Sequence, residues 1–373
     1  MTISLNCVKI DLSALEHNLN QVRGLIDSDT RIMGIVKSDA YGHGIVQVSK
    51  LLEKNRVHCL GVSYPHEALD LRDNGIKIPI VILCGIRTEK DAETVVKKDL
   101  TPVVYDLISA EMLNKVALKN REKVNIFVKI DTGMGRIGIP ASRTEAFIKV
   151  VMEHESLFIQ GMLSHLSSAD ESVHNFTRKQ VEIFRQAIDI GRKVGLELPM
   201  NSLANSAGII EHKETHFDMV RPGIMLYGGL PSPGFKTSVN LKPVMKLTGR
   251  VLQVNNLPDR TPVSYARSYY TKGNQKIAVA SIGYGDGLPR NLSNRGKVLI
   301  GGQKANIAGR ICMNMATCNI TGRTDVHPGD EVVVLGSQGE CCITGDDIAE
   351  KAETISYEIF CSIGQRVKKK YIT

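Results

Sequence analysis

The sequence contains no tryptophan and no stretch of about 18 uncharged apolar residues, the length that a membrane-spanning helix needs. Its first residues, MTISLNCVKIDLSALEHN, lack a basic segment followed by an apolar core, so they do not resemble a secretory signal peptide. We therefore expect a cytoplasmic chain with no membrane segment within these 373 residues. A membrane portion outside them, in a longer protein, is left open.

Paired cysteines and clustered charges are missing as well. The 8 cysteines form no CxxC pair and have no Cys/His metal spacing, so we expect reduced structural thiols and no metal site. The net charge is +8, but lysine and arginine are spread along the chain and gather only at 366–370. Nucleic-acid binding is therefore not expected.

The composition is that of a folded chain with room for two domains. Apolar residues make up 42% of the sequence and charged residues only 23%, with no low-complexity tract, which argues against disorder. A length of 373 residues suits a large domain followed by a smaller one.

Short β-branched apolar runs alternate with amphipathic stretches through the first 230 residues, a pattern typical of β/α units around a parallel sheet. Eight such runs are present, and eight units predict a TIM (β/α)8 barrel. The runs are 32–37, 58–63, 78–84, 100–105, 124–131, 158–165, 199–205 and 219–228. Helices are expected between them, for example over 45–55, 109–120, 142–154 and 175–195.

After PSPGF (231–235) the pattern changes to strand-like segments separated by glycine turns. We therefore expect an α/β barrel over 1–235 and a smaller β-rich C-terminal domain over 236–373, with one late helix at DDIAEKAETI (346–355). The early segment VKIDLSAL (8–15) could reach toward either domain.

Polar residues cluster where the expected barrel strands end, which is where barrel enzymes build their active sites. A single lysine at a strand end is more often an ordinary surface residue. Here it stands among other polar strand-end groups, and a partly desolvated lysine has a lowered pKa and can bond covalently to a carbonyl carbon. The strand-end residues are Lys37, His165, Asn205, Ser206, Arg221 and Gly223.

The segment VKSDAYGHG (36–44) resembles the lysine motif of alanine racemases, pyridoxal-phosphate-dependent enzymes of fold type III. Further segments resemble motifs of that family in the same order and span almost the whole chain. They are DTGMGRIG (131–138), SHLSSAD (164–170), ANSAG (204–208), VRPGIMLYG (220–228), PVSY (262–265), SIGYGDG (281–287), GRICM (309–313) and ISYE (355–358).

The resemblance implies a homodimeric racemase with shared active sites that interconverts L- and D-alanine and supplies D-alanine for peptidoglycan. Lys37 matches the lysine that binds pyridoxal 5'-phosphate and acts as one acid/base. Tyr265 matches the tyrosine that the partner subunit supplies to the opposite face. A racemase needs two such groups because a planar centre loses its proton on one side and gains one on the other.

Other residues receive their roles from the same resemblance. Arg221 matches the arginine at the pyridine nitrogen; a competing interpretation pairs it with a nearby carboxylate such as Asp218. Arg136 and Met313 match residues that contact the substrate carboxylate, and Lys129 a lysine that is carbamylated in some members. Further matches at the cofactor site, most of them at its phosphate, are Tyr41, His165, Asn205, Ser206, Gly223, Ile224 and Tyr357.

Three positions depart from the family pattern. Ser202 replaces a histidine that supports the pyridine-facing arginine, so support for Arg221 is expected from elsewhere. Asn314 replaces an aspartate, and Ala266 replaces the glycine after the base tyrosine. These changes leave open the alternative that the chain is a serine racemase of the same family. More distant alternatives are a non-catalytic pyridoxal-phosphate-binding protein and an amino-acid decarboxylase.

Overall fold

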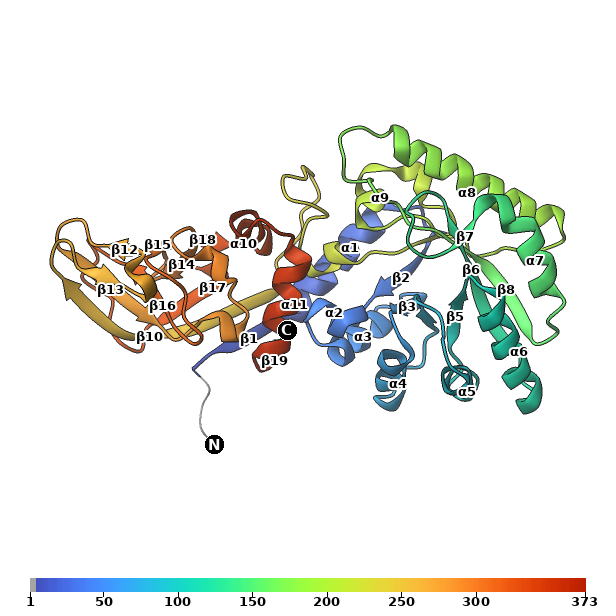
Figure 1. The fold of residues 1–373 in the computed structure, drawn as a ribbon, viewed down its shortest axis with the longest axis horizontal. Coiled ribbons are helices and arrows are strands. Elements are labelled where there is room, and N and C mark those ends of the chain that lie inside the picture. The colour runs from blue at the N-terminus through green and yellow to red at the C-terminus, as the bar shows by residue number, and fades with distance from the viewer. Residues whose placement is uncertain (1–4) are drawn as a thin grey trace.

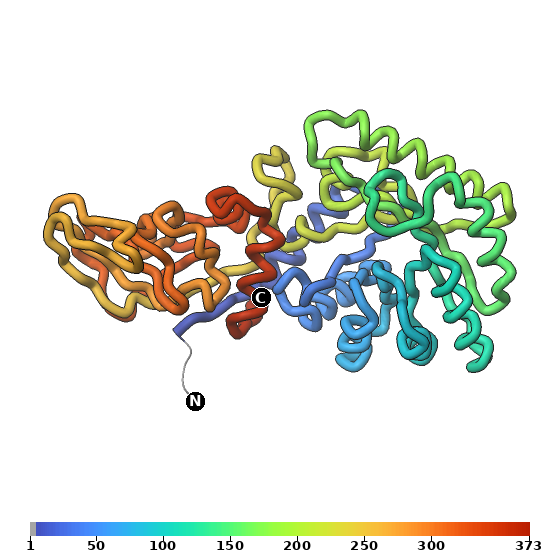
Figure 2. Tube along the Cα trace, viewed as in Figure 1, coloured from blue at the N-terminus to red at the C-terminus, as the bar shows by residue number. Residues whose placement is uncertain are grey.

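The computed structural model describes residues 5–373 and has two lobes that lie side by side (Figure 1). The first is a β/α barrel and the second is built almost entirely of strands. Helix α11 (Ser356–Arg366) and strand β1 (Cys7–Asp11) lie between them (Figures 1 and 2). Residues 1–4, where the segment judged for a signal peptide begins, lie outside the described residues.

Seven parallel strands and one irregular segment form the barrel. Hydrogen-bonded neighbours follow one another around the sheet from β8 through β6, β5, β4, β3 and β2 to β9, so β8 and β9 are its two ends. The strands are β2 (Arg31–Ile35), β3 (Cys59–Val62), β4 (Ile80–Ile82), β5 (Thr101–Val104), β6 (Val124–Asp131), β8 (Leu157–Leu163) and β9 (Met219–Val220); a short strand, β7 (Ile139–Pro140), pairs with β6 outside this ring.

The segment 201–204 occupies the remaining position, between β8 and β9. Ser202 N donates to Met162 O at 2.9 Å, and Arg221 N donates to Ala204 O at 3.0 Å. These bonds connect both neighbours and complete the expected eight-stranded barrel. The eighth run, however, was predicted too long, because only 219–220 is strand. Pro222 then removes a backbone donor, and a 3-10 turn, η3 (Ile224–Tyr227), follows.

Helices cover the outside of the barrel, which explains why its strands read as continuous apolar runs. Several begin at a side-chain cap, such as Asp11, Thr88, Asp106 and Asn205. The helices are α1 (Leu12–Leu25), α3 (Ile45–Lys54), α4 (Pro65–Asp73), α5 (Glu89–Lys97), α6 (Leu107–Asn120), α7 (Thr144–Met152), α8 (Asn175–Lys193) and α9 (Ser206–Glu211). The four helices expected by range are confirmed as α3, α6, α7 and α8.

Six antiparallel strands close into a second, smaller barrel in the β-rich lobe. Strand β10 pairs with β13 on one side and with β17 on the other, which closes the ring. The members are β10 (Met245–Leu257), β13 (Gln275–Ala280), β16 (Ala316–Asn319), β15 (Gln303–Ile307), β14 (Lys297–Ile300) and β17 (Glu331–Gln338). Strand β18 (Cys341–Ile343) pairs with β17, while β11 (Pro262–Val263) and β12 (Tyr269–Tyr270) form a separate hairpin. The expected late helix is α10 (Gly345–Ala352), and α11 was not predicted.

Both ends of the described chain join the β-rich sheet. Strand β1 pairs antiparallel with β10 and parallel with β19 (Lys369–Ile372). The first strand therefore belongs by pairing to the second domain, although the range 1–235 had placed it with the barrel. We propose a domain boundary near residue 235, with β1 as an exception that crosses it.

Candidate active site

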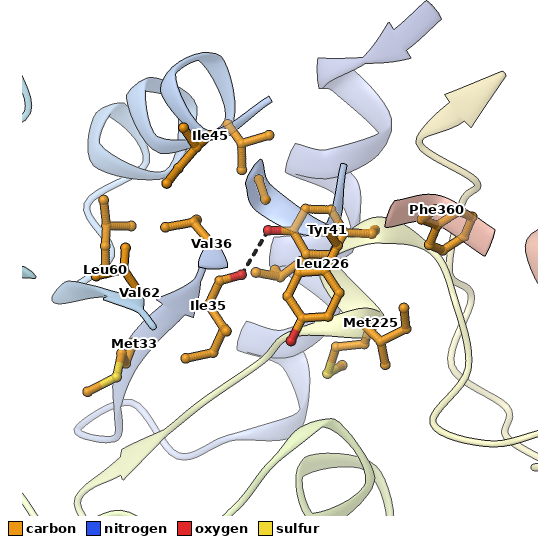
Figure 3. Packing of buried hydrophobic residues seen from close by; sticks show 14 of the residues in the cluster. Met33, Ile35, Val36, Tyr41, Ile45, Leu60, Val62, Met225, Leu226 and Phe360 are labelled. Carbon is orange, nitrogen blue, oxygen red and sulfur yellow. Dashed lines mark hydrogen bonds between the residues drawn. The ribbon is translucent and has the colours of Figure 1, made fainter. Parts of the chain in front are cut away.

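A cavity of about 550 Å³ opens at the carboxyl ends of the barrel strands. It is lined by eleven of the residues selected from the sequence, which come from six separate segments of the chain. They are Lys37, Tyr41, Lys129, Arg136, His165, Asn205, Ser206, Arg221, Gly223, Ile224 and Tyr357. Below it, apolar side chains of β2, β3, η3 and α11 pack together around Tyr41 (Figure 3). The cavity thus stands on a close-packed base, which fixes its shape.

Positive charge is concentrated in this cavity. Lys37, Lys129, Arg136 and Arg221 all line it, whereas no described lining residue carries a carboxylate. Burial lowers the pKa of Lys129 well below its usual value, and Arg221 and Arg136 add to the effect. Such a site favours a ligand that brings negative charge, because each anionic group relieves the repulsion among the cations.

Lys37 follows β2 and reaches into the cavity. Burial lowers the pKa of its amine, with a further contribution from Arg136. A lowered pKa increases the fraction of neutral amine, which is the form that attacks a carbonyl carbon or accepts a proton.

The residues after Lys37 form a left-handed turn, which is rare for residues other than glycine. From Ser38 to Tyr41 the φ angles are 53°, 54°, 53° and 54°. Each such residue costs about 1–2 kcal/mol relative to the right-handed form, so neighbouring contacts must hold the turn. The buried ring of His43 does so in part, because its Nδ1–H donates to the carbonyl oxygens of Ala40 (3.1 Å) and Tyr41 (3.0 Å).

Arg221 is held by uncharged groups. Its guanidinium donates to Ser202 Oγ at 2.6 Å and to the carbonyl oxygens of Ser164 (2.6 Å) and Leu203 (3.2 Å). Ser202 therefore supports Arg221 directly, and the expectation that support must come from elsewhere was wrong: a serine hydroxyl reaches the guanidinium from the neighbouring segment. Burial lowers the pKa of Arg221 to about 10, which keeps it charged at neutral pH.

The alternative pairing of Arg221 with a carboxylate is not observed in the described chain. Asp218 instead accepts hydrogen bonds from the backbone and side chain of Asn201, at 2.9 and 2.8 Å. The guanidinium is thus left without a counter-ion and faces the cavity.

Hydroxyl groups and closely packed backbone form another wall of the cavity. Ser206 Oγ accepts from Gly223 N at 3.0 Å, and a Cβ at Gly223 would lie 2.6 Å from Tyr41 Oη. Burial raises the pKa of Tyr41 and of Tyr357, so both phenols keep their protons and can donate hydrogen bonds. Their rings lie 5.7 Å apart between centroids. This wall supplies neutral donors, which suit a phosphate group.

Tyr265 and Met313 are not brought to this cavity within the chain. They lie in the β-rich lobe, where they are 67% and 58% exposed. The backbone around Tyr265 is strained, with φ of 63° at Ser264 and 55° at Ala266. Ser264 is anchored by its hydroxyl, which donates to Arg310 O. The tyrosine is therefore presented outward by a strained loop.

The sequence reasoning missed Glu67, which contacts the turn after Lys37. Its carboxylate accepts hydrogen bonds from Ser38 N and from Ser63 N, at 2.6 and 2.7 Å. A helix-start signal was present, since Pro65 and Glu67 stand at the first and third positions of α4. That signal predicts a helix cap but does not predict the bond to Ser38.

Two features are absent from residues 5–373. In this part of the chain no helix is both long and apolar enough to cross a membrane. The same residues contain no group of three or more His, Cys, Asp or Glu side chains placed to hold a metal ion.

Comparison with known proteins gives one consistent family. Residues 10–231 match the family model described as "Alanine racemase, N-terminal domain", and residues 244–371 match "Alanine racemase, C-terminal domain". The alanine racemase of Halothermothrix orenii is 42% identical over 363 residues, which cover 97% of this chain and 96% of that protein.

Solved structures agree with these matches. The alanine racemase of Clostridium difficile 630 has a TM-score of 0.92 at 35% identity, covering 100% of this chain and 97% of that one. The enzyme from the D-cycloserine producer Streptomyces lavendulae has a TM-score of 0.94 at 32% identity, covering 100% and 98%. The chain therefore belongs to the alanine racemase family.

Proposed function

We propose that this protein is an alanine racemase that interconverts L- and D-alanine with pyridoxal 5'-phosphate. The observation that carries the proposal is the cationic cavity around Lys37, found in a chain that belongs to the alanine racemase family. A serine racemase remains the second candidate, and the names of the relatives given above favour alanine.

The cavity fits this cofactor in size, charge and wall chemistry. It holds a lysine of lowered pKa for the aldehyde carbon, and a hydroxyl-lined wall where the missing side chain of Gly223 leaves room for a phosphate. We assign the phosphate to Tyr41, Ser206, Tyr357 and the backbone of Gly223 and Ile224, with Asn205 as a further contact. Arg221 and His165 would hold the ring, with Arg221 donating to its nitrogen.

The chain's own groups then perform the proton transfers. When bound, the cofactor's electron-withdrawing ring acidifies the α-hydrogen of the amino acid. Lys37 is the acid/base on one face, where its lowered pKa increases the fraction of neutral Nζ that can accept a proton. Arg221 donates hydrogen bonds but holds its own proton firmly, so it does not protonate the ring nitrogen.

Tyr265 is assigned to the other face and is supplied by a second copy of the chain. Its exposure, 67%, suits a residue that functions across a subunit interface. Met313 would reach the same site from the partner subunit, while Arg136 receives the substrate carboxylate from within the barrel. We propose a homodimer with two shared active sites that functions in the cytoplasm and supplies D-alanine for peptidoglycan.

The direct test is incubation of the purified chain and cofactor with L-alanine and, separately, with L-serine. We expect optical rotation to decay to zero without CO2 release, with a higher kcat/KM for alanine. Release of CO2 would indicate a decarboxylase, and binding of the cofactor without turnover would indicate a carrier. A higher kcat/KM for serine would replace the substrate assignment.

A comparison of wild type with Asn314→Asp tests whether the departure at Asn314 affects the choice between alanine and serine. Asn314 is exposed in the β-rich lobe beside Met313. An amide can both donate to and accept from a substrate hydroxyl, whereas an aspartate only accepts. We expect the aspartate variant to lower the serine-to-alanine ratio of kcat/KM. An unchanged ratio would mark Asn314 as a neutral variation.

A further inference from the structure

The left-handed turn after Lys37 is tied to the next loop of the barrel by one carboxylate. Glu67, at the start of α4, accepts Ser38 N through Oε1 at 2.6 Å. Its other oxygen accepts Ser63 N at 2.7 Å and Tyr64 N at 3.2 Å, in the loop that follows β3. One side chain thereby joins the loops that follow two neighbouring strands.

We propose that Glu67 is a positioning residue that holds the turn carrying Lys37 and sets where its amine lies in the cavity. The inference rests on the role of Lys37 proposed above. It goes beyond that role because it assigns a task to a residue outside the cavity lining.

Helix α5 provides an internal comparison that separates this task from ordinary capping. Asp91 occupies the same third position of α5 and accepts Arg87 N and Thr88 N, both at 3.0 Å. These donors belong to the loop directly before α5. Glu67 makes the equivalent bonds before α4 and adds a bond to Ser38, which is 29 residues away in sequence. That additional bond is more than a helix cap requires.

The need for such a tie follows from the backbone of the turn. Four consecutive residues other than glycine hold positive φ there, a conformation that persists only when surrounding contacts enforce it. Asp39 adds a second tie, because its two oxygens accept Ile45 N and Lys369 Nζ, both at 2.7 Å. Glu67 and Asp39 therefore join the turn to different parts of the chain.

Glu67 also brings negative charge near the Lys37 amine. The charged and titratable groups that act on Lys37 are Arg136, which lowers its pKa, and Cys84, Glu67 and Cys361, which raise it; His165 lies in the same cavity. Removing the carboxylate should therefore lower the pKa of Lys37 further, in addition to freeing Ser38 N.

The experiment uses the full-length chain without cofactor, because the Lys37 amine is then free to react. Glu67→Gln is compared with wild type and with Asp91→Asn, which removes the matching carboxylate from α5. Two quantities are measured: the pH dependence of Lys37 acetylation, read by mass spectrometry, and hydrogen exchange of peptides that cover 37–44, 63–73 and 86–97. Neither depends on racemase turnover.

For Glu67→Gln we expect roughly tenfold faster exchange in 37–44 and a downward shift in the pKa of Lys37. Asp91→Asn should accelerate exchange only in 86–97 and leave Lys37 unchanged. If Glu67→Gln alters only 63–73, Glu67 is a helix cap and the proposal fails.

A second variant covers the case in which Glu67→Gln does not fold. Glu67→Asp keeps the charge but is too short to reach both loops, so exchange in 37–44 should still accelerate while the pKa of Lys37 shifts less. Wild-type exchange in 37–44 of Glu67→Asp would overturn the proposal. Because both readouts are independent of catalysis, an inactive wild-type enzyme would count against the proposed function alone.

Discussion

Two strained segments, in different lobes, present the two residues proposed to move protons. The turn after Lys37 has positive φ from Ser38 to Tyr41; its second half, Ala40 and Tyr41, is buried, and side chains from other elements fasten it. The loop around Tyr265 has positive φ at Ser264 and Ala266, yet its tyrosine is largely exposed. The barrel therefore places Lys37 in a formed cavity, whereas the β-rich lobe presents Tyr265 on its surface.

The strongest test of this contrast is Lys37→Ala. It removes the amine that binds the cofactor and one acid/base together, so we expect kcat to fall by roughly 10³-fold or more. The visible absorbance of the protein-bound cofactor should also be lost. Lys50→Ala, at an exposed lysine of α3, is the control and should behave as wild type. A Lys37→Ala variant that keeps both its activity and its cofactor absorbance would show that Lys37 has no part in the mechanism.

A mixing experiment tests the role of Tyr265. Lys37→Ala and Tyr265→Phe should each be inactive, whereas a 1:1 mixture that exchanges subunits should recover about a quarter of wild-type activity. Half of the dimers are then mixed, and each mixed dimer has one intact site. The measurement is racemisation after unfolding and refolding the two variants together. Demonstrated exchange without recovery would contradict a shared site.

The two lobes should also differ in their response to acid. Burial lowers the pKa of His43, beneath the cavity, to about 4, while His327 is the single histidine after residue 235 and is exposed. The unfolded chain binds this proton near pH 6.5 and the folded chain does not. Stability is therefore lost as pH falls from about 6.5 to about 4, by up to about 3 kcal/mol from His43. His165, whose pKa is also lowered by burial, adds loss of the same sign.

Hydrogen exchange at pH 7 and pH 4.5 should therefore show the barrel peptides opening before those of the β-rich lobe. In His43→Gln the difference between the lobes should shrink. Urea unfolding followed by far-ultraviolet circular dichroism gives the total change, since the chain has no tryptophan to report it. Equal acid sensitivity of wild type and His43→Gln would exclude His43 as the cause.

The smallest effect is expected from Ala266→Gly. Ala266 has φ of 55°, where a Cβ is unfavourable, so glycine should stabilise the folded loop by about 0.5–1 kcal/mol. Because the loop is exposed, the change should leave the barrel unaffected, and a rise in Tm by calorimetry would detect it. Ala308→Gly, at a buried alanine of the same lobe, is the control and should destabilise. A lower Tm for Ala266→Gly would show that the methyl group contributes packing.

The barrel was predictable because its strands are buried on both faces and read as separate apolar runs. The length of the eighth strand was predicted wrongly. The apolar residues after Pro222 belong to a 3-10 turn, and hydrophobic periodicity cannot distinguish such a turn from a short buried strand. The cavity residues could be found because they stand at strand ends. Tyr265 and Met313 came only from the motif resemblance. The hydrogen bonds that Arg221 donates to Ser202 and that Ser38 N donates to Glu67 join distant segments, so no local pattern predicts them.

The pairing of β1 with β10 and β19 sets an order of events during translation. The barrel strands lie between residues 31 and 220, so the ribosome has delivered all of them before β10 is made. Strand β1 is made before the barrel strands, but its partners β10 and β19 begin only at residues 245 and 369. Until they are made, the backbone edges of β1 are unpaired and can pair with the wrong strand. Lys369 arrives with β19, so the turn that carries Lys37 gains its ion pair with Asp39 only in the last stage of assembly.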